Sequence, residues 1–216
     1  MSAALDVFDA AVPPLATAAA IGTYAGSLLD SREWRAHGTG AMSHIPLCML
    51  CANAAGWIVY GVLLANASMM VANVVGLAIA LYLLHVYNAC SPAPFSSELL
   101  THAAFLLAYM ALVALYAFAT RDASTVGTVA SLVTIAMFAS PLATVQTVIK
   151  TKSAESLPAP MIIVGLACTT LWLAYGVRLG DIFVYGPNSV AFVLGLFQVG
   201  LLIVYRKGKG NSALPL

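Results

Sequence analysis

The chain has 216 residues, of which 62% are apolar and only 8% are charged, and its mean hydropathy is +0.94. Soluble domains carry roughly 25% charged residues, so this composition excludes a water-soluble globular fold, a disordered chain and a coiled coil. The net charge of +1 provides no long-range field, and nucleic acid is therefore not expected as a partner.

Seven segments are long and apolar enough to cross a lipid bilayer, because one helical crossing needs about 20 largely apolar residues. In chain order they cover residues 12–29, 45–65, 68–88, 98–120, 124–149, 157–177 and 182–205. Backbone groups in lipid must bond within their own segment, which favours helices. We therefore expect an all-α, multi-pass integral membrane protein with seven transmembrane helices.

The basic residues between these segments predict the orientation of the chain. Two of the nine, Arg121 and Arg178, fall on one side of the membrane, and the other seven fall on the opposite side: Arg32, Arg35, Lys150, Lys152, Arg206, Lys207 and Lys209. Cytosolic loops are enriched in Lys and Arg. We therefore expect an outer or lumenal N-terminus and a cytosolic C-terminus with a tail at 206–216. The sequence leaves open whether the membrane is the plasma membrane or an internal one.

Two stretches of the chain match each other at an offset of 115 residues (172 − 57). Each contains Trp-x-x-Tyr-Gly and then an Asn: Trp57, Tyr60, Gly61 and Asn73 in the first, and Trp172, Tyr175, Gly176 and Asn188 in the second. Three crossings reverse the chain direction, so parallel repeats need one linking helix. We expect a 3+1+3 arrangement, with three-helix repeats at 1–93 and 123–205 and a linker helix at 94–122. Such repeats place a substrate site between them near the bilayer midplane.

These motifs resemble those of the SWEET sugar transporters over nearly the whole chain. In the second half the resemblance rests on Ser140-Pro141, the segment TVIKTKSAESLP, Trp172-x-x-Tyr175-Gly176, Asp181 and Pro187-Asn188. In the first half it rests on Pro46, Asn53, Tyr60-Gly61 and Asn73. It implies a facilitative uniporter that moves a mono- or disaccharide across the bilayer by alternating access. We expect no enzyme activity and no cofactor.

Four residues are the expected sugar ligands. Asn73 and Asn188 offer amide donors and an acceptor to neighbouring hydroxyl groups, and the alternative is that each amide bonds an adjacent helix. Trp172 and Trp57 can stack on the apolar face of a sugar ring, and the alternative is an anchor at the membrane surface. Two facing indole rings narrow the site, which favours a monosaccharide such as glucose.

Tyr60 and Asp181 lie at the outer ends of their helices. The resemblance implies that they form an outer gate, closed by a hydrogen bond from the phenol to the carboxylate. A bond of this kind costs only about 1–3 kcal/mol to break, which suits a reversible gate. The alternative for Asp181 is a solvated loop carboxylate.

Three prolines, Pro46, Pro141 and Pro158, lie in the cytosolic parts of their helices and are expected to form a flexible inner gate, because proline inside a helix produces a kink. For Pro46 and Pro158 the alternative is ordinary helix-start chemistry. The resemblance implies a fourth proline in the first helix, but residues 26–29 (Gly-Ser-Leu-Leu) contain none. Glycine and serine are expected to supply the flexibility there.

No Asp or Glu lies in the interior of a predicted crossing, since Glu98 stands at the end of its segment, and this argues against transport coupled to ions or protons. His85 is the main candidate for proton handling. Cys48 and Cys51 have the spacing of a metal or redox pair, but no second pair accompanies them, so no metal site is expected. His44 and His102 are interpreted as residues at the membrane boundary.

Two other functions are consistent with seven helices. A related carrier for an amino acid or another small neutral metabolite would share the fold, but a zwitterion calls for charged residues in the cavity. A seven-helix receptor would need a long cytosolic segment for its partner, and the predicted loops are short. The sequence leaves open whether copies of the chain form a homo-oligomer.

Overall fold

The computed structural model describes residues 2–40 and 42–205, and within them the chain forms nine α-helices and no strand. The helices are α1 (Ser2–Gly26), α2 (Leu28–His37), α3 (Ile45–Leu63), α4 (Ala67–Cys90), α5 (Ser97–Thr120), α6 (Ala123–Met137), α7 (Ala139–Thr151), α8 (Ala159–Leu179) and α9 (Ile182–Val204). Seven helical segments are long and apolar enough to cross a membrane, which confirms the predicted fold class. The predicted tail at 206–216, with Arg206, Lys207 and Lys209, lies outside the described residues.

Five crossings are single helices, α3, α4, α5, α8 and α9, and their bounds lie within two residues of the prediction. Their ends follow the local sequence. Asn66, Asp122 and Asp181 begin α4, α6 and α9, because their side chains accept backbone N–H groups of the first turn. Gly180 ends α8 with a positive φ of 66°, a conformation that glycine adopts without strain.

The first crossing is longer than the predicted 12–29. Helix α2 continues the helical segment to His37, so that Arg32 and Arg35 lie on a helix and not in a loop. No Gly or Pro interrupts α2, and it ends at Gly38, which has a φ of 75°. The prediction was wrong because it rested on hydropathy, which falls where a helix leaves the bilayer even though the helix continues.

Two crossings are interrupted, the first at Ser27 and the fifth at Phe138. Pro141 has no N–H to bond the carbonyl four residues back, and this gives a direct reason for the second break. At both breaks the backbone N–H bonds three residues back, from Ser27 to Tyr24 at 3.1 Å and from Phe138 to Ile135 at 3.0 Å. The first crossing therefore also breaks, although residues 26–29 contain no proline and Pro13 and Pro14 lie far upstream in α1.

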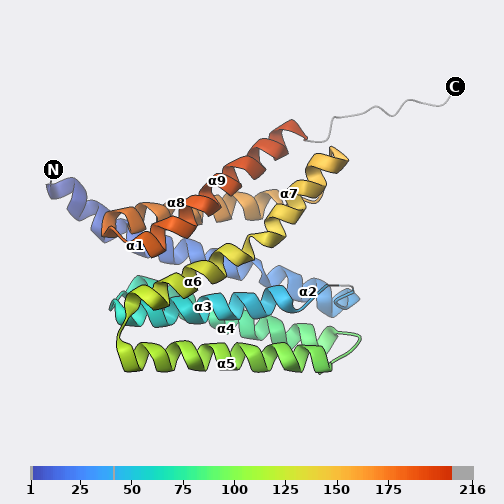
Figure 1. Cartoon of the computed structure of the whole chain (residues 1–216). Helices are drawn as coiled ribbons and strands as arrows, with labels where there is room; N and C mark the ends of the chain where they lie inside the picture. Colours follow the sequence, from blue (N-terminus) through green and yellow to red (C-terminus); the bar gives the residue numbers. More distant parts are fainter. Residues whose placement is uncertain (1, 41, 206–216) are drawn as a thin grey trace.

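The nine helices form one bundle in which α1 packs against α4 and α8, α3 packs against α4, α5 and α6, and α9 packs against α8 and α6. We name the end at which α3, α5 and α8 finish the Asp181 end, and the opposite end, at which α3 begins, the Pro46 end. Figure 1 shows that the helices converge at the Asp181 end and that α7 and α9 diverge from α2, α3 and α4 toward the Pro46 end.

The outside of the bundle is apolar. On α5, which lies at the edge in Figure 1, the side chains of Phe105, Leu112 and Phe118 are 69%, 66% and 75% exposed. Contiguous apolar exposure of this kind is rare on soluble proteins. These side chains therefore face lipid.

Candidate functional site

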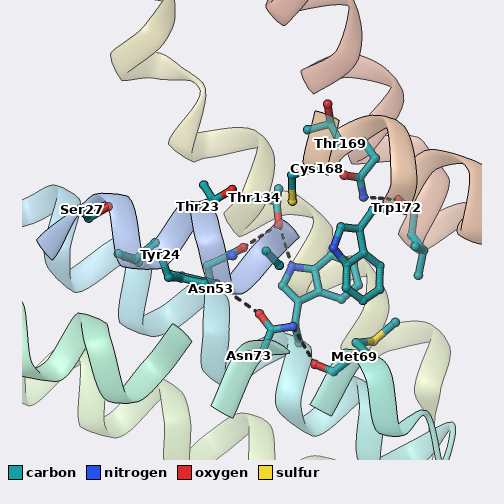
Figure 2. Close-up of a pocket in the computed structure, with 15 residues that line it drawn as sticks. Thr23, Tyr24, Ser27, Asn53, Met69, Asn73, Thr134, Cys168, Thr169 and Trp172 are labelled. Atoms are coloured by element: carbon teal, nitrogen blue, oxygen red, sulfur yellow. Dashed lines mark hydrogen bonds between the residues drawn. The ribbon is translucent and has the colours of Figure 1, made fainter. Parts of the chain in front are cut away.

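A cavity of about 300 Å³ lies inside the bundle, and none of the 15 side chains that line it carries a charge. They come from six helices, α1, α3, α4, α6, α8 and α9, and from the turn at Ser27 (Figure 2). The lining residues are Ala20, Thr23, Tyr24, Ser27, Leu50, Asn53, Trp57, Met69, Asn73, Thr134, Cys168, Thr169, Trp172, Val184 and Asn188. The cavity thus combines hydroxyl and amide groups with aromatic walls.

All four expected ligands line this one cavity. Asn73 is buried, its amide nitrogen donates to the Met69 carbonyl at 2.9 Å, and its amide oxygen accepts from the Tyr24 hydroxyl at 3.3 Å (Figure 2). Asn188 is half-buried, and its amide nitrogen donates to the Val184 carbonyl at 2.8 Å. Both amides therefore bond the carbonyl one turn back in their own helix, which fixes their orientation and leaves further donor and acceptor capacity at Asn188.

Trp57 belongs to a polar network that crosses from α3 to α6. Its indole N–H donates to the Thr134 hydroxyl at 3.0 Å, and that hydroxyl lies 2.6 Å from the Asn53 amide oxygen, to which it can donate. Because the indole nitrogen is held in this way, the ring of Trp57, only 8% exposed, has a fixed orientation in the wall of the cavity.

Each cavity tryptophan also contacts the tyrosine three residues later. The ring of Trp57 meets that of Tyr60 with centroids 5.7 Å apart at 79°, and the ring of Trp172 meets that of Tyr175 at 5.8 Å and 58°. Such tilted arrangements are favourable for aromatic pairs. They connect the wall of the cavity to the Asp181 end.

Two hydrogen bonds join opposite halves of the chain at the Asp181 end. The Tyr60 hydroxyl donates to the Asp181 carboxylate at 2.9 Å, and the role of this pair as an outer gate stays a prediction. In addition, the Asn66 amide nitrogen donates to the Tyr175 hydroxyl at 2.8 Å. Asp181 is half-buried and caps α9, so it is not simply a solvated loop carboxylate.

The three prolines lie outside the cavity lining. Pro46 is the second residue of α3, and Pro158 is the residue that caps α8 at its start. Pro141 lies in the first turn of α7, next to the break at Phe138. Their role as an inner gate stays a prediction.

His85 is exposed on α4 and is not among the residues that line the cavity.

Sequence reasoning missed several polar residues of the site. The repeat could have found Asn66, which lies 115 residues before Asp181. Asn53 was named only for the family resemblance, and its place one turn before Trp57 and 115 residues before Cys168 could have marked it as a cavity residue. The repeat gives no indication of Tyr24 and Thr134. They lie outside the matching motifs and reach the cavity through the packing of α1 and α6.

Known relatives agree with this architecture. A family described as sugar efflux transporters for intercellular exchange matches residues 14–94 and 124–210. The sugar transporter SWEET1 of Drosophila pseudoobscura pseudoobscura is 29% identical over 201 residues, which cover 88% of each chain. The bidirectional sugar transporter SWEET11 of Arabidopsis thaliana is 29% identical over 191 residues, which cover 85% of this chain and 65% of the relative.

A solved structure of a eukaryotic SWEET transporter superposes with a TM-score of 0.85 at 22% sequence identity, covering 93% of this chain and 97% of the other. At this identity the likeness establishes the fold. The family match covers well over half of the chain. The chain therefore belongs to the SWEET family of sugar transporters.

Proposed function

We propose that this chain is a facilitative sugar transporter that moves a monosaccharide such as glucose through the central cavity. The observation that carries the proposal is the pairing of Asn73 with Asn188 and of Trp57 with Trp172 around one uncharged cavity. Relatives named as sugar transporters support the substrate class.

The chemistry of the lining suits a sugar. Each ring hydroxyl both donates and accepts, and an amide presents donors and an acceptor in one plane. Asn188 has donor and acceptor capacity beyond its bond to Val184, and the hydroxyl groups of Thr23 and Thr169 also line the cavity. The indole rings offer apolar faces to the C–H faces of a pyranose.

The arrangement of the helices supports alternating access by two parallel repeats, 1–93 and 123–205, with α5 as the linker. The Asp181 end is held together by the Tyr60–Asp181 and Asn66–Tyr175 hydrogen bonds, whereas the ribbons diverge toward the Pro46 end (Figure 1). In the proposed cycle the Asp181 end opens as the Pro46 end closes.

The charge distribution supports an outer or lumenal Asp181 end and a cytosolic Pro46 end. Arg121 and Arg178 lie at the Asp181 end, whereas Arg32 and Arg35 on α2 and Lys150 and Lys152 at the end of α7 lie toward the Pro46 end. This is the pattern of the positive-inside rule.

The uncharged lining supports a substrate without charge and transport without a coupling ion. A proton-coupled carrier needs an ionisable relay within the membrane, and the cavity lining contains no Asp, Glu, Lys, Arg or His. A carrier for a zwitterionic amino acid would need partners for two charges. The apposed tryptophans favour a ring of monosaccharide size.

The experiment is uptake of radiolabelled glucose by liposomes that contain the purified protein, with and without a proton gradient. We expect equal initial rates, because the residues that line the cavity include no Asp, Glu, Lys, Arg or His that could relay a proton. Glucose uptake that rises with the proton gradient would contradict uniport. An absence of flux for every sugar would favour a receptor. Flux of an amino acid alone would favour the related carrier.

The site is tested by Asn188→Ala, which we expect to weaken glucose transport by roughly 5–150-fold, as for the loss of a hydrogen bond of about 1–3 kcal/mol. Ser189→Ala is the matched control. Its hydroxyl also bonds one turn back, to the Tyr185 carbonyl at 2.7 Å, but Ser189 does not line the cavity. If Asn188→Ala transports glucose at the wild-type rate, Asn188 is not a sugar ligand and the proposed site is wrong.

A further inference from the structure

Two histidines and a glutamate meet at the Pro46 end, away from the cavity. His44 lies directly before α3, and Glu98 and His102 lie on the first turns of α5. The Nε2 atom of His44 lies 2.8 Å from the Nδ1 atom of His102, and the ligand atoms of all three residues lie within 4.8 Å of one another.

The fold positions these side chains from two elements. Glu98 and His102 are four residues apart on α5, so they lie on the same face of the helix. Ser96 caps α5 by accepting the Leu99 N–H at 3.2 Å, which fixes the register of this first turn. Helix α3 packs against α5 and brings His44 to that face.

The position of His44 is also fixed. Its side chain is buried, and its ring lies against that of Tyr87, with centroids 6.1 Å apart. The Tyr87 hydroxyl donates to the Met42 carbonyl at 2.7 Å, and its ring meets Trp34 edge to face at 5.9 Å. The loop that carries His44 is thus held against α4, and the imidazole is presented to α5 by its surroundings.

We propose that His44, Glu98 and His102 bind a divalent transition metal ion, with zinc as the representative ion. Two imidazole nitrogens and a carboxylate are a common set of protein ligands for zinc, which leaves a fourth position for water. In a tetrahedral site with Zn–N bonds of about 2.0–2.1 Å, two ligand nitrogens lie about 3.3 Å apart. Metal binding therefore requires the two nitrogens to separate by about half an ångström and the Glu98 carboxylate, now within 4.8 Å, to move closer.

The hydrogen bond between His44 and His102 is also compatible with metal binding. At 2.8 Å the two nitrogens share one proton, so one of them already presents a lone pair to the other. When a metal binds through Nε2 of His44 and Nδ1 of His102, the ring that donates the hydrogen bond moves its proton to its other nitrogen. The ring that accepts already carries its proton on the nitrogen away from the contact, so both rings bind the ion as neutral imidazoles. A bound ion would join the start of α3, two residues before Pro46, to α5.

Zinc binding to the purified protein can be measured without reference to transport, because none of the three residues lines the cavity. We expect zinc chloride to raise the Tm of the wild-type protein, since a ligand of the folded state stabilises it. His44→Ala and His102→Ala should each weaken zinc binding by about tenfold or more, and Glu98→Gln should weaken it less, because Glu98 is exposed.

His37→Ala is the matched control. His37 and Glu33 form an exposed pair with the same spacing of four residues and a distance of 3.4 Å, and among the described residues they belong to no group of three ligands. This variant should respond to zinc as the wild type does. An equal zinc response in the His44→Ala, His102→Ala double variant, or no response in the wild type, overturns the proposal.

X-ray absorption at the zinc edge keeps the test independent of how the variants fold. The wild-type complex should show nitrogen and oxygen neighbours at about 2.0–2.2 Å. Sulfur neighbours at about 2.3 Å would assign the ion to the cysteines and overturn the proposed site.

Discussion

Asn66 and Asp181 occupy the same place in the two repeated segments, 115 residues apart, and each caps a helix while it bonds a tyrosine from the other segment. Their partners, Tyr175 and Tyr60, are separated by the same offset. The Asp181 end is therefore held by two reciprocal contacts, of which one contains a carboxylate and the other is neutral. Hydrogen bonds to a charged group are the stronger kind, so we expect the Tyr60–Asp181 contact to dominate.

Tyr60→Phe should open the Asp181 end more often, because it removes the hydrogen bond and keeps the ring. Loss of about 1–3 kcal/mol corresponds to a shift of roughly 5–150-fold between closed and open forms. The measurement is the rate at which a membrane-impermeant thiol reagent, added on the side that the Asp181 end faces, modifies Cys168 in the cavity.

Tyr116→Phe is the matched control for this variant. The Tyr116 hydroxyl donates to the Asp122 carboxylate at 3.0 Å, but both residues flank the same α5–α6 connection. It should leave the modification rate unchanged. If Tyr60→Phe also leaves the rate unchanged, the bond does not act as a gate.

Trp57→Ala should alter the choice of sugar. Without this indole the cavity is wider and one stacking surface is lost, so we expect weaker glucose uptake and a higher ratio of disaccharide to glucose uptake. Removing a buried tryptophan also destabilises a fold by about 3–5 kcal/mol. Trp34→Ala provides the comparison, since Trp34 is equally buried but lies in a separate cluster. It should lower the Tm and preserve the ratio.

Modification of Cys168 should block transport. The residue is half-buried and lines the cavity, whereas Cys48 and Cys51 are buried in the bundle. A small thiol reagent should therefore inhibit glucose uptake, and excess glucose should slow the inhibition. Cys168→Ala should resist the reagent, and Cys90→Ala should remain sensitive. Inhibition of the Cys168→Ala protein at the wild-type rate would show that the reagent acts elsewhere.

Gly76→Ala should impair transport through Tyr24. A methyl group on Gly76 would overlap the Tyr24 ring, and moving that ring breaks its bond to Asn73. We expect the KM for glucose to rise about tenfold, which is about 1.4 kcal/mol. In Gly22→Ala the added methyl meets no atom within 4 Å, so this variant should transport normally. If Gly76→Ala and Gly22→Ala have the same KM for glucose, the Tyr24–Asn73 hydrogen bond does not contribute to sugar binding.

The transmembrane helices could be predicted from the sequence because length and hydropathy are local properties. The shared position of Asn73 and Asn188 also followed, because the repeat relates them. Flexibility at residues 26–29 was expected from glycine and serine, but the exact place and form of the break, a tightened turn at Ser27, could not be predicted because no proline marks it. The contact between His44 and His102 depends on how α5 docks on α3, and spacing along the chain carries no information about that.

The two repeats place identical tryptophans and asparagines in the wall of the cavity. One turn before the tryptophans they differ, because Asn53 on α3 has Cys168 on α8 as its counterpart. One flank therefore presents an amide beside the Thr134 hydroxyl, and the other presents a thiol. We therefore expect a pyranose in this cavity to turn its more hydrophilic edge toward Asn53 and Thr134. Epimers that differ at that edge should be carried unequally, even though the frame around them was built by duplication.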